Sequence, residues 1–73
     1  MELIKGKIYR VTPEQTETST YLRFVGYDKK VRSADFELVK GVSFYLSDYG
    51  IIPFPEDDIF YLYEPTPEEL ENL

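Results

Sequence analysis

The sequence predicts a small all-β domain of five short strands that ends in a brief helical turn. Bulky and polar residues alternate with a period of two in the runs KIYRV, YLRFVGYD, ADFELV and VSFYLS, and the apolar run IFYLYE follows. This period places one face of a strand on a core and the other in water. The 73 residues include seven Tyr and five Phe, whose large buried surfaces can supply a core without disulfides. This length allows a single domain.

The first strand is expected from Leu3 to Val11, with a bend or bulge at Gly6. Residues 12–19 contain no apolar side chain and predict an exposed loop. The second strand is expected from Thr20 to Tyr27. After a charged turn, the third is expected from Ala34 to Val39.

A fourth strand, Val42 to Ser47, is expected to form a hairpin with the third. The core-facing side chains expected on the second, third and fourth strands are Leu22, Phe24, Phe36, Leu38, Phe44 and Leu46. A one-residue slip would move these side chains to the other face, so the core selects the register. That register pairs Phe36 with Leu46 and needs a three-residue loop or a bulge at Gly41.

The segment DYGIIPFPEDD is expected to be irregular because its two prolines cannot donate to a strand ladder. Its apolar residues Ile51, Ile52 and Phe54 are expected against the core, and Pro55–Asp58 is expected to form one helical turn. The last strand is expected from Ile59 to Glu64.

Residues 66–73 carry the signature of a helix start, and we separate them as a tail from a single β domain of residues 1–65. Thr66 suits the N-cap, Pro67 the first helical position, and Glu69 the third position of a capping box. Eight residues are too few for a stable isolated helix. The tail therefore either docks through Leu70 and Leu73 or frays.

Five short strands, a polar first loop and a Pro-rich turn before the final strand resemble a Src-homology-3-like small barrel, over roughly residues 3–64. A curled antiparallel sheet and a five-stranded oligonucleotide-binding-like barrel are the alternatives. The run PFPEDD differs from the acidic pattern of the peptide-binding signalling members, and Trp is absent. The resemblance therefore implies a fold and does not imply binding of proline-rich peptides.

The composition argues against catalysis and against metal or cofactor binding. The chain has no Cys and no His, which removes thiolate and imidazole ligands and the commonest general base. Glu56, Asp57 and Asp58 are consecutive and read as a solvated acidic turn. The four glycines are scattered, so no phosphate-binding loop is expected. No apolar run approaches the roughly 20 residues of a membrane span. We therefore expect a cytoplasmic protein with no catalytic residues, metal or cofactor.

Charge and tyrosine distribution favour a small non-catalytic protein-binding or accessory protein. All eight Lys and Arg residues lie in residues 1–40, whereas residues 41–73 contain acids and no bases. Tyr is enriched at protein interfaces. The predicted contact residues are Tyr21, Tyr27, Tyr45, Tyr61, Tyr63, Glu68 and Glu69. The expected partner is another protein or a second copy of the chain. The small size and the lack of catalytic residues suggest a phage or mobile-element origin.

The alternative hypothesis is a role related to nucleic acids. The basic residues Arg23, Lys29, Lys30 and Arg32 would contact phosphates in a weak single-strand binder. In a second form of this hypothesis, the acidic stretch 56–71 imitates DNA and occupies a basic groove of another protein. A net charge of −6 opposes the approach of a polyanion and argues against binding of nucleic acid itself.

Overall fold

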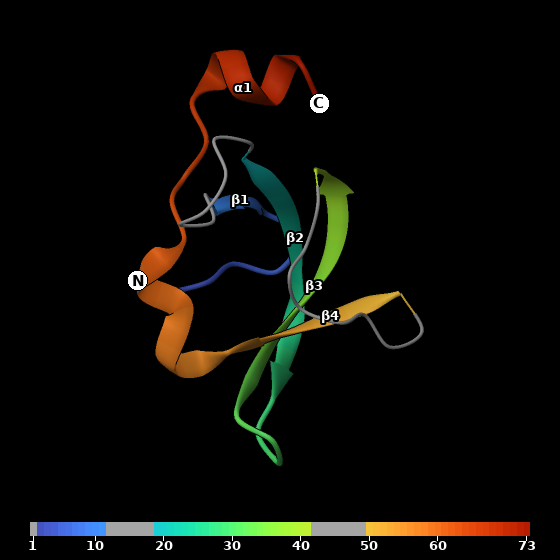
Figure 1. Ribbon diagram of the computed structural model, residues 1–73, viewed down its shortest axis with the longest axis vertical. Coiled ribbons are helices and arrows are strands. Elements are labelled where there is room, and N and C mark those ends of the chain that lie inside the picture. The colour runs from blue at the N-terminus through green and yellow to red at the C-terminus, as the bar shows by residue number, and fades with distance from the viewer. Residues whose placement is uncertain (1, 12–18, 42–49) are drawn as a thin grey trace.

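The computed structural model describes residues 2–11, 19–41 and 50–73, which form an open, four-stranded antiparallel sheet with short turns of helix after it (Figure 1). The elements in chain order are β1 (Ile8–Val11), β2 (Thr20–Asp28), β3 (Ser33–Lys40), β4 (Ile51–Pro55), the 3-10 turn η1 (Glu56–Tyr61) and α1 (Pro67–Glu71). Each strand pairs with the next along the chain. The mostly β architecture is confirmed. Barrel closure is wrong, because the described strands form an open sheet with β1 and β4 at its two edges.

β1 is shorter than expected because the chain turns at Gly6, which has φ +87°. The Lys7 amide donates to the Ile4 carbonyl oxygen at 3.1 Å and closes this turn. At the end of β2, a charged turn joins β2 to β3. There Asp28 accepts a hydrogen bond of 3.0 Å from the Lys30 amide. Short Asp side chains favour turns through this type of local contact.

Phe36 lies at the centre of the core. Its ring centroid is 5.5 Å from that of Phe24, 5.8 Å from Phe54 and 6.4 Å from Tyr9. The buried apolar residues of the described chain are Leu3, Tyr9, Leu22, Phe24, Ala34, Phe36, Ile52, Phe54 and Leu62. The burial expected from period two on β2 and the first half of β3 is thus confirmed.

The expected burial of Leu38 is wrong, since its side chain is 46% exposed. The pairing between β3 and β4 ends at Glu37, so Leu38 lies beyond the cover of β4. Phe36 pairs with Phe24 on one side and with Ile52 on the other, so its expected pairing with Leu46 is also wrong. The fourth expected strand, 42–47, lies outside the described residues, as do Phe44 and Leu46.

A second correction concerns residues 51–55, which form the edge strand β4 although two of them are prolines. Ile52 and Phe54 are buried, as expected. Glu56 follows Ile52 and Phe54 at the same two-residue spacing, and its amide donates to the Arg32 carbonyl oxygen at 3.1 Å. Pro53 and Pro55 occupy the intervening positions, whose amides would point away from β3. Proline is tolerated at such edge positions because no ladder hydrogen bond is lost.

The expected last strand, Ile59 to Glu64, is replaced by the end of η1 and one isolated bridge. Ile59 and Leu62 are three residues apart and pack on the core, which is the spacing of a 3-10 turn. The bridge joins Tyr63 to Arg10 on β1. Two residues further along, Pro65 would stand opposite Ile8 and has no amide proton to extend the pairing.

The capping box of the tail is confirmed. The Glu69 amide donates to Thr66 Oγ1 at 3.2 Å, and the Thr66 amide donates to Glu69 Oε1 at 3.1 Å. α1 and the β2–β3 turn lie at opposite ends of the long axis (Figure 1). Across the described ranges, none of the helical segments is long and apolar enough to cross a bilayer.

Candidate functional site

Three exposed aromatic residues of the described chain, Phe60, Tyr61 and Tyr63, lie in one short stretch, which we call the aromatic segment. Their side chains are 68%, 41% and 51% exposed. The Phe60 and Tyr61 rings stack on each other, with centroids 4.1 Å apart and planes inclined by 35°. Two consecutive residues thus present a joined apolar surface to solvent.

The aromatic segment is held by buried or paired neighbours. Leu62, in its middle, is only 2% exposed, and its amide donates to the Ile59 carbonyl oxygen at 2.9 Å. Tyr63 exchanges two backbone hydrogen bonds of 2.8 Å with Arg10, whose guanidinium lies 5.7 Å from the centre of the Tyr63 ring. These anchors fix the backbone while the rings remain outside.

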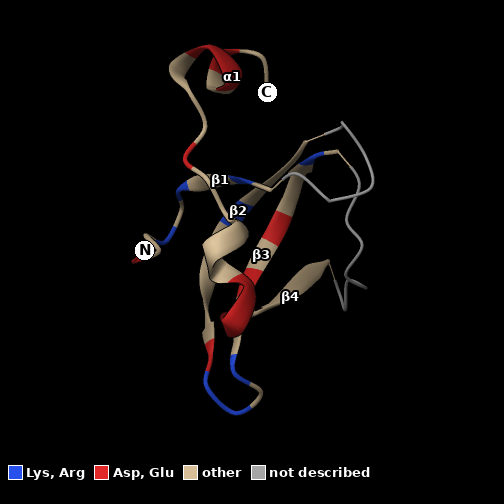
Figure 2. Cartoon of the chain, turned by 60° about the vertical axis from the view of Figure 1, so that its left-hand side comes forward, with Lys and Arg blue, Asp and Glu red and all other residues tan. Residues whose placement is uncertain are grey.

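Carboxylates flank the aromatic segment on both sides, and Figure 2 shows the acidic start of η1. Glu56 forms an ion pair of 3.7 Å with Arg32, and Asp57 is exposed. On the other side, Glu64 forms an ion pair with Lys7. The hydrogen bond with Glu64 raises the pKa of Lys7 above its ordinary value. The exposed rings therefore lie between two carboxylates that are paired with basic side chains, and Asp57 is a further exposed acid near them.

A second group of side chains, the Glu69 cluster of Arg10, Tyr21 and Glu69, connects α1 to the sheet. Glu69 Oε2 accepts hydrogen bonds from the Tyr21 hydroxyl at 2.6 Å and from Arg10 Nη1 at 3.0 Å. The hydrogen bond from Tyr21, with those from the Thr66 backbone and Arg10, lowers the pKa of Glu69 to about 2. The same Tyr21–Glu69 bond raises the pKa of Tyr21 above 10.0. Tyr21 and Glu69, both predicted as partner contacts, thus bind each other.

The remaining predicted contact residues are dispersed. Tyr27 follows a register shift between Phe24 and Gly26, and its ring packs edge-on against Phe24 at 4.9 Å. An uninterrupted period of two would place Tyr27 on the face opposite Phe24. The register shift interrupts the alternation, so Tyr27 pairs with Ala34 and its ring lies on the same face as Phe24, with 46% of the side chain exposed. Glu68 is exposed on α1, and Tyr45 lies outside the described residues.

The four basic residues of the nucleic-acid hypothesis do not form one free cationic surface. Arg23 lies 3.5 Å from Glu37, and Arg32 pairs with Glu56. Lys29 and Lys30 are exposed in the β2–β3 turn. Half of this set is thus paired with carboxylates.

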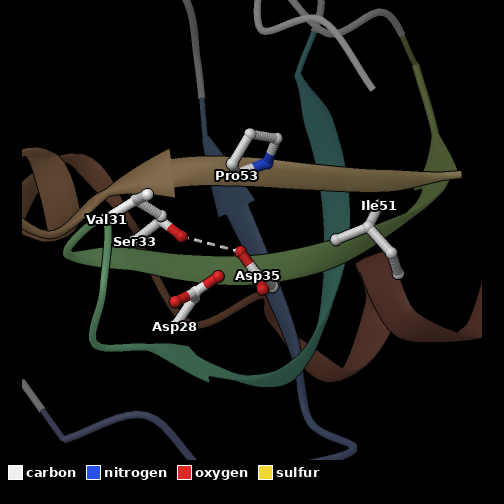
Figure 3. Close-up of a pocket in the computed structure, with 6 residues that line it drawn as sticks. All are labelled: Asp28, Val31, Ser33, Asp35, Ile51 and Pro53. Carbon is white, nitrogen blue, oxygen red and sulfur yellow. Dashed lines mark hydrogen bonds between the residues drawn. The ribbon is translucent and has the colours of Figure 1, made fainter. Parts of the chain in front are cut away.

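A hollow of about 280 Å³ lies between the β2–β3 turn and β4 (Figure 3). Its lining residues are Asp28, Val31, Ser33, Asp35, Ile51 and Pro53. The Ser33 hydroxyl donates to Asp35 Oδ1 at 2.8 Å. Within the described ranges, no group of three or more Asp, Glu, His or Cys side chains is arranged to hold a metal ion.

Comparisons with protein-family models, with curated proteins and with solved structures found no match to this chain. Its function is therefore argued from its own residues.

Sequence reasoning did not select Arg10 or Phe60 as functional residues. Arg10 lies between Tyr9 and Val11, so the alternation alone places it on the face opposite the buried Tyr9 ring. Phe60 lies in a run that is apolar at every position, and no period identifies its exposed face. The three-residue spacing of Ile59 and Leu62 is the signal that would have found it.

Proposed function

We propose that this chain is a small non-catalytic protein-binding protein that contacts its partner through the aromatic segment. The observation that carries the proposal is the stacked, exposed pair of Phe60 and Tyr61 on an anchored turn. The absence of Cys and His is consistent with this proposal and with a cytoplasmic location.

Anchoring makes these rings suitable for binding. A side chain that is already fixed loses less conformational entropy when a partner covers it. Aromatic residues are enriched at interfaces, and a few of them usually supply most of the binding energy. The stacking of Phe60 on Tyr61 and the backbone bridge at Tyr63 restrict the segment before any partner arrives.

The margin of the segment indicates the chemistry of the partner. Asp57 is exposed. The carboxylates of Glu56 and Glu64 lie near the two ends of the aromatic segment. Complementary potentials across an interface increase association rate and specificity. Because Glu56 and Glu64 are already paired with Arg32 and Lys7, the exposed charge of this margin is that of Asp57. The partner surface is therefore an apolar depression with a basic side chain positioned to meet Asp57.

The proposal is tested with Phe60→Ala and a matched control, Val31→Ala. Both residues are 68% exposed, and neither belongs to the core, so both variants should keep the fold. Wild-type protein and both variants are immobilised, and the proteins captured from host lysate are quantified by mass spectrometry. We expect one set of proteins to be captured by wild type and Val31→Ala and to be lost with Phe60→Ala.

Equal capture of the same proteins by all three forms would contradict the proposal. Sedimentation of the purified proteins separates a second copy from a foreign partner. If the partner is a second copy, wild type and Val31→Ala associate with increasing concentration and Phe60→Ala remains monomeric.

A further inference from the structure

Among the residues that the structure describes, the hydrogen bonds that attach α1 to the sheet are made by polar side chains. None of its residues is buried, and Leu70 and Leu73 are exposed. The described attachments are those of Glu69 to Arg10 and Tyr21 and a hydrogen bond of 3.4 Å from Lys40 Nζ to the Asn72 carbonyl oxygen. A five-residue helix has little stability of its own. Release of the tail would therefore uncover no fully buried residue of α1.

The sheet holds Arg10 and Tyr21, the two residues that bind Glu69, next to each other. Arg10 on β1 and Tyr21 on β2 are directly opposite each other in the antiparallel register, so both side chains project from the same face. Arg10 is also placed by its contact with the Tyr63 ring. A guanidinium and a hydroxyl held side by side form a donor set for a carboxylate.

Glu69 uses only one of its two carboxylate oxygens to bind Arg10 and Tyr21. Its Oε2 accepts from Tyr21 and Arg10, whereas its Oε1 accepts from the Thr66 amide in the capping box. Arg10 binds it through Nη1, and Arg10 Nε is buried without an acceptor among the described residues. A carboxylate with no capping role has both oxygens available for the guanidinium, which favours paired hydrogen bonds.

We propose that Arg10 and Tyr21 form a carboxylate-binding site that Glu69 closes within the chain and that an acidic peptide segment of a partner protein occupies when the tail lifts. Lys40, which now donates to the tail backbone, is a further cation for such a segment. Arg10 also contacts Tyr63 of the aromatic segment, but Phe60 and Tyr61 are not part of the site, and the inference does not rest on the proposed function.

The test uses the full chain and a synthetic peptide of residues 66–73, TPEELENL, as the probe. The variant Glu69→Ala removes the internal ligand, and Glu68→Ala is the matched control because Glu68 is an exposed acid next to it. Binding is followed by chemical shifts of Arg10 Nε–Hε and of the Tyr21 ring. Circular dichroism first establishes that each variant keeps its strands.

We expect saturable binding of the peptide to Glu69→Ala. If the tail closes the site in about nine molecules of ten, wild type and Glu68→Ala bind about tenfold more weakly. Adding Arg10→Gln to Glu69→Ala should abolish the binding. A peptide with Gln in place of Glu69 should also fail.

Three results would overturn the proposal. Binding of equal strength to wild type and Glu69→Ala would show that Glu69 does not close the site. Absence of binding to a folded Glu69→Ala protein would show that Arg10 and Tyr21 do not bind a carboxylate from another molecule. Displacement of the peptide by an equal concentration of acetate, with sodium chloride as the salt control, would show a site for any small carboxylate rather than for an acidic peptide.

Discussion

The Tyr21 hydroxyl donates a hydrogen bond of 2.6 Å to Glu69 Oε2, which links side chains 48 positions apart in the sequence. Arg10 donates to the same oxygen at 3.0 Å. One carboxylate therefore receives both a neutral and a charged donor from the sheet while it caps its own helix. This arrangement makes the attachment of the tail sensitive to pH at both extremes.

The acid limb of this dependence follows from Glu69. The pKa of Glu69 falls from 4.5 to about 2 in the folded protein. As the pH is lowered, Glu69 is therefore protonated in the unfolded chain before it is protonated in the folded protein. The stabilisation is complete above pH 4.5 and is lost as the pH falls towards 2. Urea unfolding of wild type and Glu69→Ala should therefore differ at pH 6, with wild type more stable, and the two curves should converge near pH 2. A difference of constant size across this range would contradict the assignment.

The alkaline limb follows from Tyr21. The pKa of Tyr21 is raised above 10.0 because its hydroxyl donates a hydrogen bond to Glu69 that ionisation would break, and burial and the Glu69 charge act in the same direction. The stabilisation is complete below pH 10 and is lost as the pH rises through the raised value. We expect the chemical shift of the Tyr21 ring carbon next to the hydroxyl, followed by NMR, to titrate at a higher pH in wild type than in Glu69→Ala. Identical titration in the two proteins would exclude the hydrogen bond.

The core predicts a large contrast between two residues of β3. Phe36 is fully buried among three other rings, whereas Leu38 is 46% exposed. Replacing a buried Phe with Ala costs about 3–5 kcal/mol, and we expect Leu38→Ala to cost less than about 1 kcal/mol. Denaturant unfolding measures both values. If Phe36→Ala does not fold, Phe36→Leu should still lower the midpoint more than Leu38→Ala. Equal losses would contradict the described core.

Two glycines with positive φ differ in their surroundings. A Cβ at Gly41, with φ +100°, would lie 2.7 Å from the Ser19 carbonyl oxygen, whereas one at Gly50, with φ +82°, meets nothing within 4 Å. We expect Gly50→Ala to cost about 1 kcal/mol from backbone conformation alone. Gly41→Ala should cost more, up to about 3 kcal/mol, because backbone must also shift. Thermal unfolding of both variants measures this order, and the reverse order would place Gly41 away from Ser19.

The sequence predicts those parts of the fold that rest on local patterns. Period two identified β2 and the first half of β3, and the capping box of Thr66 and Glu69 identified the start of α1. In contrast, the run from Ile59 to Tyr63 is apolar throughout, so strand and 3-10 periods fit it equally well. Tertiary packing of Ile59 and Leu62 decides between them.

The candidate sites depend on contacts that no local pattern encodes. Tyr21 was expected at a partner interface because Tyr is common there, but its hydroxyl binds Glu69, far along the chain. The face of Tyr27 does not follow from the period of β2, because the register shift before Gly26 changes the face of the residues after it. Such shifts and long-range hydrogen bonds follow from the whole sheet rather than from neighbouring residues.

The most direct test of the account is an NMR measurement of proximity between the tail and the sheet in wild-type protein at neutral pH. We predict nuclear Overhauser contacts between the Tyr21 ring protons and the Glu69 side chain. Contacts between Phe24 and Phe36, whose ring centroids are 5.5 Å apart, are the internal control. Observation of the Phe24–Phe36 contacts without any Tyr21–Glu69 contact would contradict the attachment of the tail through Glu69.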